Sequence, residues 1–408
     1  FQQCINLKKV LINGKTYASN ENIADIAGID SIGDFAFDGC KALTTVNLST
    51  SENLYIGKSA FSNCVSLTGI VLPMSNANNL GDSAFAGCTS LREITFNDNL
   101  NYIPSNCFNA THPFKIMLIG KTYSNKNAMP SGLTYVGASA FQDCILSSMD
   151  FSNSKKLTYL GEYSFSAAML GNLILPPALN KISSRAFNAA AISSPLVIPD
   201  SVTTIEDGAF IEASLKGITL SANLTTINDS VFSGCYFAGN NFKINAPSKL
   251  KKIGNKAFYK SYGLTNTDFI KDINSLTEIG DYAFAGCSQA ETDQIEGKYK
   301  KDIYGSWIYE GLTDVKLPNS VTTLGKNIFM NDYSLETVNL GSGVTEIPEN
   351  AFKMDQIAYS SLKKVILPEN VTKINAYAFA NNGKLRTVGY TNGSKITETP
   401  GVAQFGNK

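Results

Sequence analysis

The dominant pattern in the chain is a set of apolar positions that recurs about every two dozen residues. The stretch "IGDFAFDGC" (32–40) returns as "IGKSAFSNC" (56–64), "LGDSAFAGC" (80–88) and, with small changes, many times more. Ile32, Ala36, Phe37 and Cys40 are spaced about four residues apart, which predicts one short helical turn that buries all four side chains.

A second apolar pattern, L-x-x-[IV]-x-L, follows each anchor phenylalanine. Leu67, Ile70 and Leu72 are an example, and the alternation at their end predicts a short strand with inward apolar side chains. In several copies a proline comes next, and because proline lacks the N–H that a strand ladder needs, it ends the strand and turns the chain. These prolines are Pro73, Pro176, Pro199, Pro318 and Pro368.

The anchors recur mostly every 22 to 27 residues, with two longer intervals of 36 and 33 residues, which is typical of a solenoid. They are Phe1, Phe37, Phe61, Phe85, Phe108, Phe141, Phe165, Phe187, Phe210, Phe232, Phe258, Phe284, Trp307, Phe329, Phe352 and Phe379. In this reading Trp307 fills the gap between Phe284 and Phe329. One unit cannot bury its own apolar face, so the units must stack.

The domain prediction is therefore one continuous array of about sixteen units over residues 1–390. Its first unit is truncated, and irregular insertions fall near residues 13–31, 120–133 and 288–303. After Tyr390 the pattern fades, so residues 391–408 are expected to form a C-terminal cap or tail.

Two stretches match a known repeat almost position for position. "LTDVKLPNSVTTLGKNIF" (312–329) and "LKKVILPENVTKINAYAF" (362–379) resemble the BspA-like (Treponema-type) leucine-rich repeats, and the resemblance extends over nearly the whole chain. It implies a right-handed leucine-rich-repeat solenoid of the α/β class, with short parallel strands on the concave face and short helical turns and loops on the convex face. It also implies an exported or lipid-anchored bacterial protein linked to adhesion.

Composition and charge narrow the possible partners. The chain has 34 basic and 34 acidic residues and a formal net charge of zero. Clustered Lys and Arg residues, which nucleic acids and anionic membranes require, do not stand out. No apolar run approaches the ~18 residues of a membrane-spanning segment. The chain opens with Phe1, inside a repeat, so we expect a signal or lipid anchor upstream.

The cysteines first suggest reactive chemistry, but their positions favour packing. Seven of the eight lie three residues after an anchor aromatic: Cys4, Cys40, Cys64, Cys88, Cys144, Cys235 and Cys287. Other units place Ala, Ser or Thr there, and a nucleophile or metal ligand does not tolerate that exchange, whereas a small buried residue does. Disulfides between neighbouring units are the alternative. Zinc is poorly supported, because the chain lacks a C-x-x-C pair and has one histidine.

Two other motifs give little support for ligand binding or catalysis. "GKT" occurs at 14–16 and 120–122, but the glycine that a phosphate-binding loop needs five residues earlier is Lys9 or Lys115. We interpret the two copies as a duplicated surface loop. The single histidine, His112, precedes a proline, and we interpret it as a turn residue without a catalytic partner.

Candidate binding surfaces remain. Residues 291–311 are charged and aromatic, and we expect a contact patch from Tyr299, Lys300, Lys301, Tyr304 and Tyr309. The outward strand positions of the predicted concave face are small, neutral and rich in hydrogen-bonding groups: Thr45, Asn47, Thr95, Ser148, Thr219, Asn241, Thr337 and Asn339. The carboxylates Glu93, Asp150, Asp268 and Asp314 are expected to lie far apart as solvated residues.

Three functions are compatible with these features. The first is a non-enzymatic interaction module of the bacterial cell surface or of a secreted protein, which binds protein (host matrix or another surface protein) or glycan through the concave face or residues 291–311. The second is a structural stalk that displays another domain, and the third is a polysaccharide-active enzyme. No catalytic residue, cofactor or metal site is expected, and a monomer is favoured.

Overall fold

The computed structural model describes residues 1–7, 10–11, 23–25, 29–48, 53–74, 79–113, 115–119, 127–237, 242–288, 300–301, 307–308 and 311–390. Both "GKT" motifs, Asn241, the tyrosines at 299, 304 and 309, and the predicted tail at 391–408 lie outside these residues. The chain divides into two compact units, Phe1–Val202 and Thr203–Lys408, which are described in turn.

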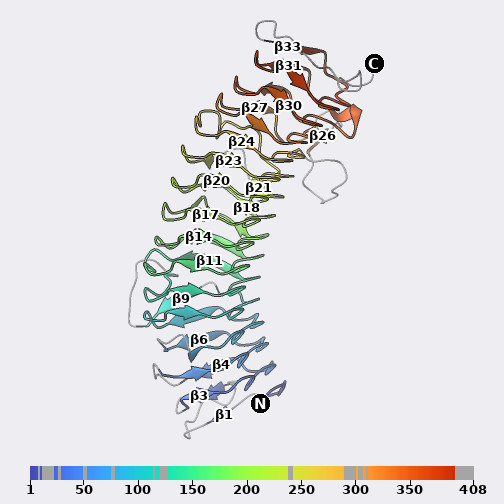
Figure 1. The fold of residues 1–408 in the computed structure, drawn as a ribbon. Coiled ribbons are helices and arrows are strands. Elements are labelled where there is room, and N and C mark those ends of the chain that lie inside the picture. The colour runs from blue at the N-terminus through green and yellow to red at the C-terminus, as the bar shows by residue number, and fades with distance from the viewer. Residues whose placement is uncertain are drawn as a thin grey trace. The chain divides into compact units, whose positions relative to one another are not determined.

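Both units are parallel β-solenoids, which confirms the predicted fold class. Each successive repeat forms one coil, and the coils of a unit lie one above another (Figure 1). The strands β6 (Gly69–Leu72) and β7 (Glu93–Phe96) show the principle, because they pair in parallel with Ile70 opposite Ile94 and Leu72 opposite Phe96. These four side chains are buried, and Val71 between them faces outward. The alternation expected from the sequence is therefore present.

The first unit contains four parallel ladders. The largest has six strands in the order β1 (Val10–Leu11), β2 (Ile23–Asp25), β4 (Thr45–Asn47), β6, β7 and β9 (Lys115–Leu118). Two others are β3 (Ser31–Ile32) with β5 (Tyr55–Ile56), and β8 (Tyr102–Ile103), β10 (Tyr135–Val136) and β12 (Tyr159–Leu160). The fourth is β11 (Ile145–Asp150), β13 (Met169–Ile174) and β15 (Ala191–Ile192). The strands β14 (Lys181–Ile182) and β16 (Leu196–Val197) complete the unit.

The second unit repeats this arrangement. Its longer ladders are β20 (Thr226–Ile227), β23 (Lys252–Ile253), β24 (Glu278–Ile279) and β28 (Thr323–Leu324), and β27 (Asp314–Lys316), β29 (Thr337–Asn339), β31 (Lys364–Leu367) and β33 (Thr387–Tyr390). Its pairs are β18 (Ser214–Leu215) with β21 (Tyr236–Phe237), β19 (Ile218–Thr219) with β22 (Ile244–Asn245), and β30 (Glu346–Ile347) with β32 (Lys373–Ile374). The others are β17 (Thr204–Ile205), the antiparallel pair β25 (Lys300–Lys301) and β26 (Trp307–Ile308), and the 3₁₀ helix η2 (Ile357–Tyr359).

The core of each unit contains a column of stacked phenylalanines. Phe61 is fully buried, and its ring centroid lies 5.1 Å from that of Phe37 and 5.5 Å from that of Phe85, with the three rings nearly parallel. In the first unit the column comprises Phe1, Phe37, Phe61, Phe85, Phe108, Phe141, Phe165 and Phe187. In the second it comprises Phe210, Phe232, Phe258, Phe284, Phe329, Phe352 and Phe379.

Trp307 is not a member of this column, which corrects the sequence interpretation. The rings of Phe284 and Phe329 stack directly on each other at 5.7 Å, and β24 pairs directly with β28. The backbone of Trp307 instead belongs to the antiparallel pair β25–β26. Two rings in contact leave no room for a third between them, so the described anchors number fifteen, eight in the first unit and seven in the second.

The segment that carries each anchor is a chain of turns rather than the expected helical turn. In residues 33–40 the amides of Ala36, Asp38 and Cys40 bond to carbonyls three residues back, whereas those of Phe35, Phe37 and Gly39 bond to the next coil. The residues two before and two after the anchor have positive φ, 58° at Phe35 and 71° at Gly39. Left-handed residues at these two positions prevent a helix from propagating, and every second amide from Phe35 to Gly39 points toward the neighbouring coil.

Candidate functional site: the outer faces of the parallel sheets

The outer face of the six-stranded sheet offers two rows of side chains that lie in register across its strands. One row contains Thr45, Gly69, Glu93 and Lys115, because these residues are paired across β4, β6, β7 and β9. Lys115 Nζ lies 3.0 Å from Glu93 Oε1, so the two charges neutralise each other at the surface. Both side chains are almost half exposed, so this ion pair adds little stability.

The second row exposes two apolar side chains, Val71 and Met117, that the sequence reasoning missed. Val71, Thr95 and Met117 are neighbours across β6, β7 and β9, and Val71 is 51% exposed. We name this set the Val71–Met117 stripe. Its signal was the middle residue of each L-x-x-[IV]-x-L strand, which must point outward when its two apolar neighbours point inward. Thr45 also faces outward and is exposed, and Asn47 and Thr95 are half-buried.

The outer face of the second unit is charged instead. Asp314 accepts hydrogen bonds from Lys316 and Thr337, and Lys316 Nζ also lies 3.5 Å from Asp268 Oδ1. Partial burial opposes ionisation of Asp314, but the hydrogen bonds from Lys316 and Thr337 outweigh it and hold the pKa of this carboxyl below its ordinary value. The lysine is thus shared between two carboxylates.

Asp268 and Asp314 therefore lie close together, contrary to the expectation that the four carboxylates are far apart. They are 46 residues apart in sequence, but the coils that contain them are neighbours, since Asn266 forms a β-bridge with Asp314. Glu93 and Asp150 belong to the other unit. Within the part of the chain that the structure describes, no group of three or more His, Cys, Asp or Glu side chains is arranged to hold a metal ion.

A half-exposed tyrosine ladder lies beside the main sheet of the first unit. The rings of Tyr102 and Tyr135 stack at 4.7 Å, those of Tyr135 and Tyr159 at 5.0 Å, and Lys181 Nζ lies 5.5 Å from the centroid of Tyr159. Burial raises the pKa of Tyr102 and of Tyr135. The sequence signal was a tyrosine directly before the Ile, Val or Leu of each two-residue strand. Because the rings cover one another, only their edges and hydroxyls face solvent.

The insert that was expected to form a contact patch is only partly described. Lys300 and Lys301 form β25, which pairs antiparallel with β26, so that Lys301 is opposite Trp307. Tyr299, Tyr304 and Tyr309 lie outside the described residues. The binding role of this insert therefore stays a proposal.

The cysteines make a structural contact rather than forming a reactive site. All eight are free thiols, and every one except Cys4 is buried. Cys64, Cys88, Cys144 and Cys287 each donate a hydrogen bond of 3.0–3.1 Å to the carbonyl of an anchor Phe in the preceding coil, as does Cys40 to Phe1. Burial raises the pKa of Cys64 and of Cys144 to about 12, which keeps both thiols protonated. His112 also contacts backbone, with Nδ1 lying 3.0 Å from Thr89 O.

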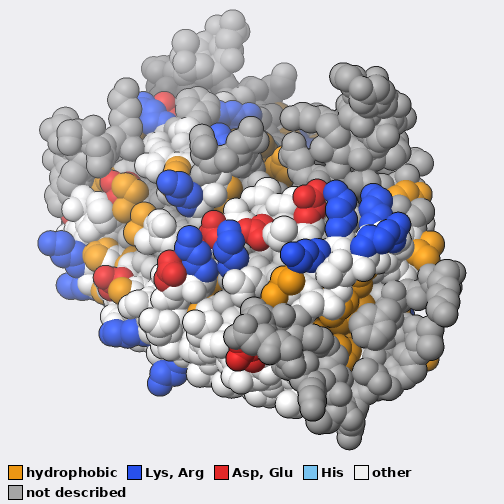
Figure 2. Space-filling model, turned by 90° about the horizontal axis from the view of Figure 1, so that it is seen from above, with side chains coloured by type: hydrophobic (Ala, Val, Ile, Leu, Met, Phe, Trp, Pro, Cys, Tyr) orange, Lys and Arg blue, Asp and Glu red, His pale blue; other side chains and the backbone are white. Residues whose placement is uncertain are grey.

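On the face shown in Figure 2, basic and acidic side chains are interspersed with uncharged ones. No helix among the described residues is both long and apolar enough to cross a bilayer.

The family model for the BspA type leucine rich repeat region matches residues 1–127, 120–238, 204–309, 236–358 and 308–400. The chain belongs to this family. Its members are generally protein-interaction modules. No curated protein matches the chain.

Several solved structures resemble the chain at low sequence identity. A leucine-rich repeat protein from Bacteroides ovatus is 20% identical, with 82% of each chain covered and a TM-score of 0.46. A leucine rich cell surface protein from Faecalibacterium prausnitzii is 22% identical, with 94% of this chain and 93% of that chain covered and a TM-score of 0.37. The pneumococcal vaccine antigen PcpA is 15% identical, with 82% and 85% covered and a TM-score of 0.41.

Proposed function

We propose that this chain is a non-enzymatic protein-binding module of the bacterial cell surface or extracellular space. The observation that carries the proposal is the Val71–Met117 stripe, which exposes two apolar side chains on the outer face of a parallel sheet in a family of interaction modules. Exposed apolar side chains on a regular surface favour a contact site, because covering them removes apolar area from water.

Binding at this face would combine burial with hydrogen bonding. Val71 and Met117 supply apolar area, and the unbranched Met117 adapts to different partner shapes. Thr45 and Asn47 supply hydroxyl and amide groups at its border, and the Glu93–Lys115 pair adds no net charge. A protein partner, such as a host matrix protein or another surface protein, fits this composition better than a nucleic acid, which requires clustered positive charge.

Residues 291–311 provide a second proposed contact. Tyr299, Lys300, Lys301, Tyr304 and Tyr309 combine aromatic and basic side chains, a composition common at interface hot spots. A glycan is the alternative partner for this patch.

The test is a binding screen of the full chain against purified extracellular-matrix proteins and glycans. We expect at least one protein to bind at micromolar affinity, and the double variant Val71→Asp/Met117→Asp to weaken it by about tenfold or more. Ile145→Asp is the matched control, because Ile145 is 47% exposed on β11 outside the stripe. Unchanged binding by the double variant would remove the stripe from the proposal, and no protein hit at all would refute it.

A further inference from the structure

The parallel ladder of the second unit is interrupted after β22. The strand pairs with β19 on one side, where the carbonyls of Lys243 and Asn245 accept hydrogen bonds of 2.9 and 3.0 Å. Backbone groups of alternate residues in a parallel strand point to opposite neighbours. The N–H and C=O of Ile244 therefore point away from β19, toward residues 263–269.

No hydrogen bond joins β22 to residues 263–269 within the described parts of the chain. That segment is bonded on its far side to β27, since Thr313 N donates to Thr265 O at 2.9 Å and Thr267 N donates to Asp314 O at 3.3 Å. By the same alternation, the backbone N–H and C=O of Asn266 point back toward β22. Ile244 and Asn266 thus face each other across a gap, each with backbone groups that no strand pairs.

The local sequence explains the gap. Residues 264–269 read "LTNTDF", whereas a regular coil reads "LTGIVL" (67–72), so Thr267 replaces the buried Ile and Phe269 replaces the buried Leu. The Thr267 hydroxyl accepts from Lys316 N at 2.7 Å and donates to Lys316 O at 3.0 Å, which holds the segment against β27. Phe269 is larger than Leu and remains half-buried at the surface.

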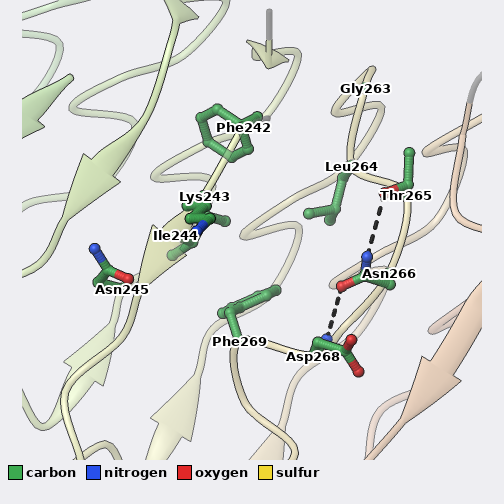
Figure 3. Close-up of a pocket in the computed structure, with 10 residues that line it drawn as sticks. All are labelled: Phe242, Lys243, Ile244, Asn245, Gly263, Leu264, Thr265, Asn266, Asp268 and Phe269. Atoms are coloured by element: carbon green, nitrogen blue, oxygen red, sulfur yellow. Dashed lines mark hydrogen bonds between the residues drawn. The ribbon is translucent and has the colours of Figure 1, made fainter. Parts of the chain in front are cut away.

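The gap is a cleft of about 350 Å³ whose lining is polar and apolar in about equal parts. Figure 3 shows Phe242 and Ile244 on one side and Leu264 and Phe269 across the opening. Two of these rings are held in place by others, because Phe242 stacks on Phe237 at 4.3 Å and Phe269 contacts Phe258 at 5.5 Å. The volume lies at the lower end of the ~300–1,000 Å³ typical of ligand pockets.

The charges around the cleft differ between its sides. Asp268 is already paired with Lys271 and Lys316. Lys243 is exposed and forms no ion pair with any described residue. The cleft therefore presents one uncompensated positive charge beside the apolar side chains of Phe242, Leu264 and Phe269.

We propose that this cleft binds a short extended peptide that pairs with the free edge of β22. The peptide backbone bonds to the N–H and C=O of Ile244, one aromatic or large aliphatic side chain lies between Phe242, Leu264 and Phe269, and an adjacent acidic side chain pairs with Lys243. Main-chain bonds of this kind supply affinity, and the side-chain pocket supplies selectivity. The proposal rests on the proposed role as a protein-binding module, for which it names a second site.

The test uses a random heptapeptide library displayed on phage, selected against the full chain. We expect enriched peptides to combine an aromatic or large aliphatic residue with a neighbouring Asp or Glu. Their synthetic versions should slow amide hydrogen exchange at Ile244. Lys243→Glu should lower the affinity of these peptides by about tenfold or more. Thr265→Trp should fill the cleft and abolish their binding. Lys364→Glu is the matched control, since Lys364 is also exposed on a strand but lies on β31, and it should leave their binding unchanged.

Three results would overturn the proposal. These are no enrichment over the Thr265→Trp variant, peptides that bind the Lys243→Glu variant equally well, and slowed exchange at Ile244 only with glycans. Circular dichroism of each variant separates loss of binding from loss of fold. If a matrix protein still binds through the Val71–Met117 stripe while no peptide is selected, the cleft proposal fails and the proposed function stands. If peptides are selected but no matrix protein binds, the cleft proposal stands and the proposed binding through the Val71–Met117 stripe fails.

Discussion

The thiol of Cys64 donates a hydrogen bond to the backbone carbonyl of Phe37, 3.1 Å away in the preceding coil. Ser261 makes the same contact with Phe232 O at 2.6 Å, and Asn382 makes it with Phe352 O at 2.7 Å. In these coils the side chain three residues after the anchor donates a hydrogen bond that links two coils, whereas an Ala at this position has no side-chain donor.

The first prediction concerns this donor. Cys64→Ser should keep the stability of the first unit within about 0.5 kcal/mol, and Cys64→Ala should cost about 1 kcal/mol, because only Ser replaces the hydrogen bond. Urea unfolding monitored by circular dichroism measures both.

A thiol-specific reagent at pH 8 should modify Cys4 rapidly and the buried thiols only after unfolding, since burial raises the pKa of Cys64 and Cys144 to about 12. Rapid modification of Cys64 in the folded chain would contradict this account.

The second prediction concerns the aromatic column. Phe61→Ala should destabilise the first unit by about 3–5 kcal/mol, because it removes a fully buried ring that contacts rings on both sides. Hydrogen exchange should speed up most in the coils of Phe37 and Phe85, since each coil packs only on its neighbours. Phe35→Ala is the control, because that side chain is 39% exposed, and its effect should be small. Equal effects of the two variants would argue against the column as the main core.

The third prediction uses the left-handed residues of the turn segments. Ala167 has a φ of 54° and is exposed, so Ala167→Gly should raise the free energy of unfolding by about 1 kcal/mol by relieving the clash that a Cβ makes in this conformation. Ala138 has no positive φ, and Ala138→Gly should instead lower stability by about 0.5–1 kcal/mol. Opposite shifts of the urea midpoint are the expected outcome, and shifts of the same sign would exclude this explanation.

The fourth prediction concerns Asp332, which occupies the donor position in the coil of Phe329. Its side chain is fully buried, Oδ1 accepts from Cys287 N at 2.7 Å, and Oδ2 has no partner. Burial raises the pKa of this carboxyl well above its ordinary value, and the single bond from Cys287 N only partly offsets it. The folded state therefore prefers the protonated acid.

Stability should fall as the pH rises from about 4, the ordinary value for Asp, toward the raised pKa of the folded state. Asp332→Asn should remove this loss, because an amide keeps the acceptor and adds a donor, as Asn382 does. We expect the variant and the parent protein to be equally stable below about pH 4, and the Asp332→Asn variant to gain a growing advantage as the pH rises. Urea midpoints measured across this range would refute the account if the difference between the two proteins stayed constant.

The repeat made much of the fold predictable. The period and the L-x-x-[IV]-x-L strands led to a parallel solenoid, because no single unit can bury its own apolar face. The conformation of the turn segments could not be predicted in the same way, since Ser59, Ser83 and Tyr163 adopt positive φ without being glycine. Their conformation is imposed by hydrogen bonds to the next coil, which a local spacing rule does not include.

The sites were less predictable than the fold. The Val71–Met117 stripe follows from strand alternation, and so it was within reach of the sequence. The cleft beside β22 was not, because "LTNTDF" differs from the regular pattern by only two residues, Thr267 and Phe269. The cleft opens because the Thr267 hydroxyl bonds to Lys316 of β27 and not to β22. The sequence pattern does not show which of the two strands this hydroxyl contacts in the folded chain.

The direct stacking of Phe284 on Phe329 has a consequence for engineering. These residues are 45 positions apart in sequence, about twice the usual interval, yet their ring separation of 5.7 Å lies within the 5.1–5.7 Å range of the column. The entropy cost of closing a longer connection grows only with the logarithm of its length. The connection between these two coils is therefore a suitable insertion site. A foreign loop, an epitope or a small domain can be inserted there without disturbing the stacked rings on either side.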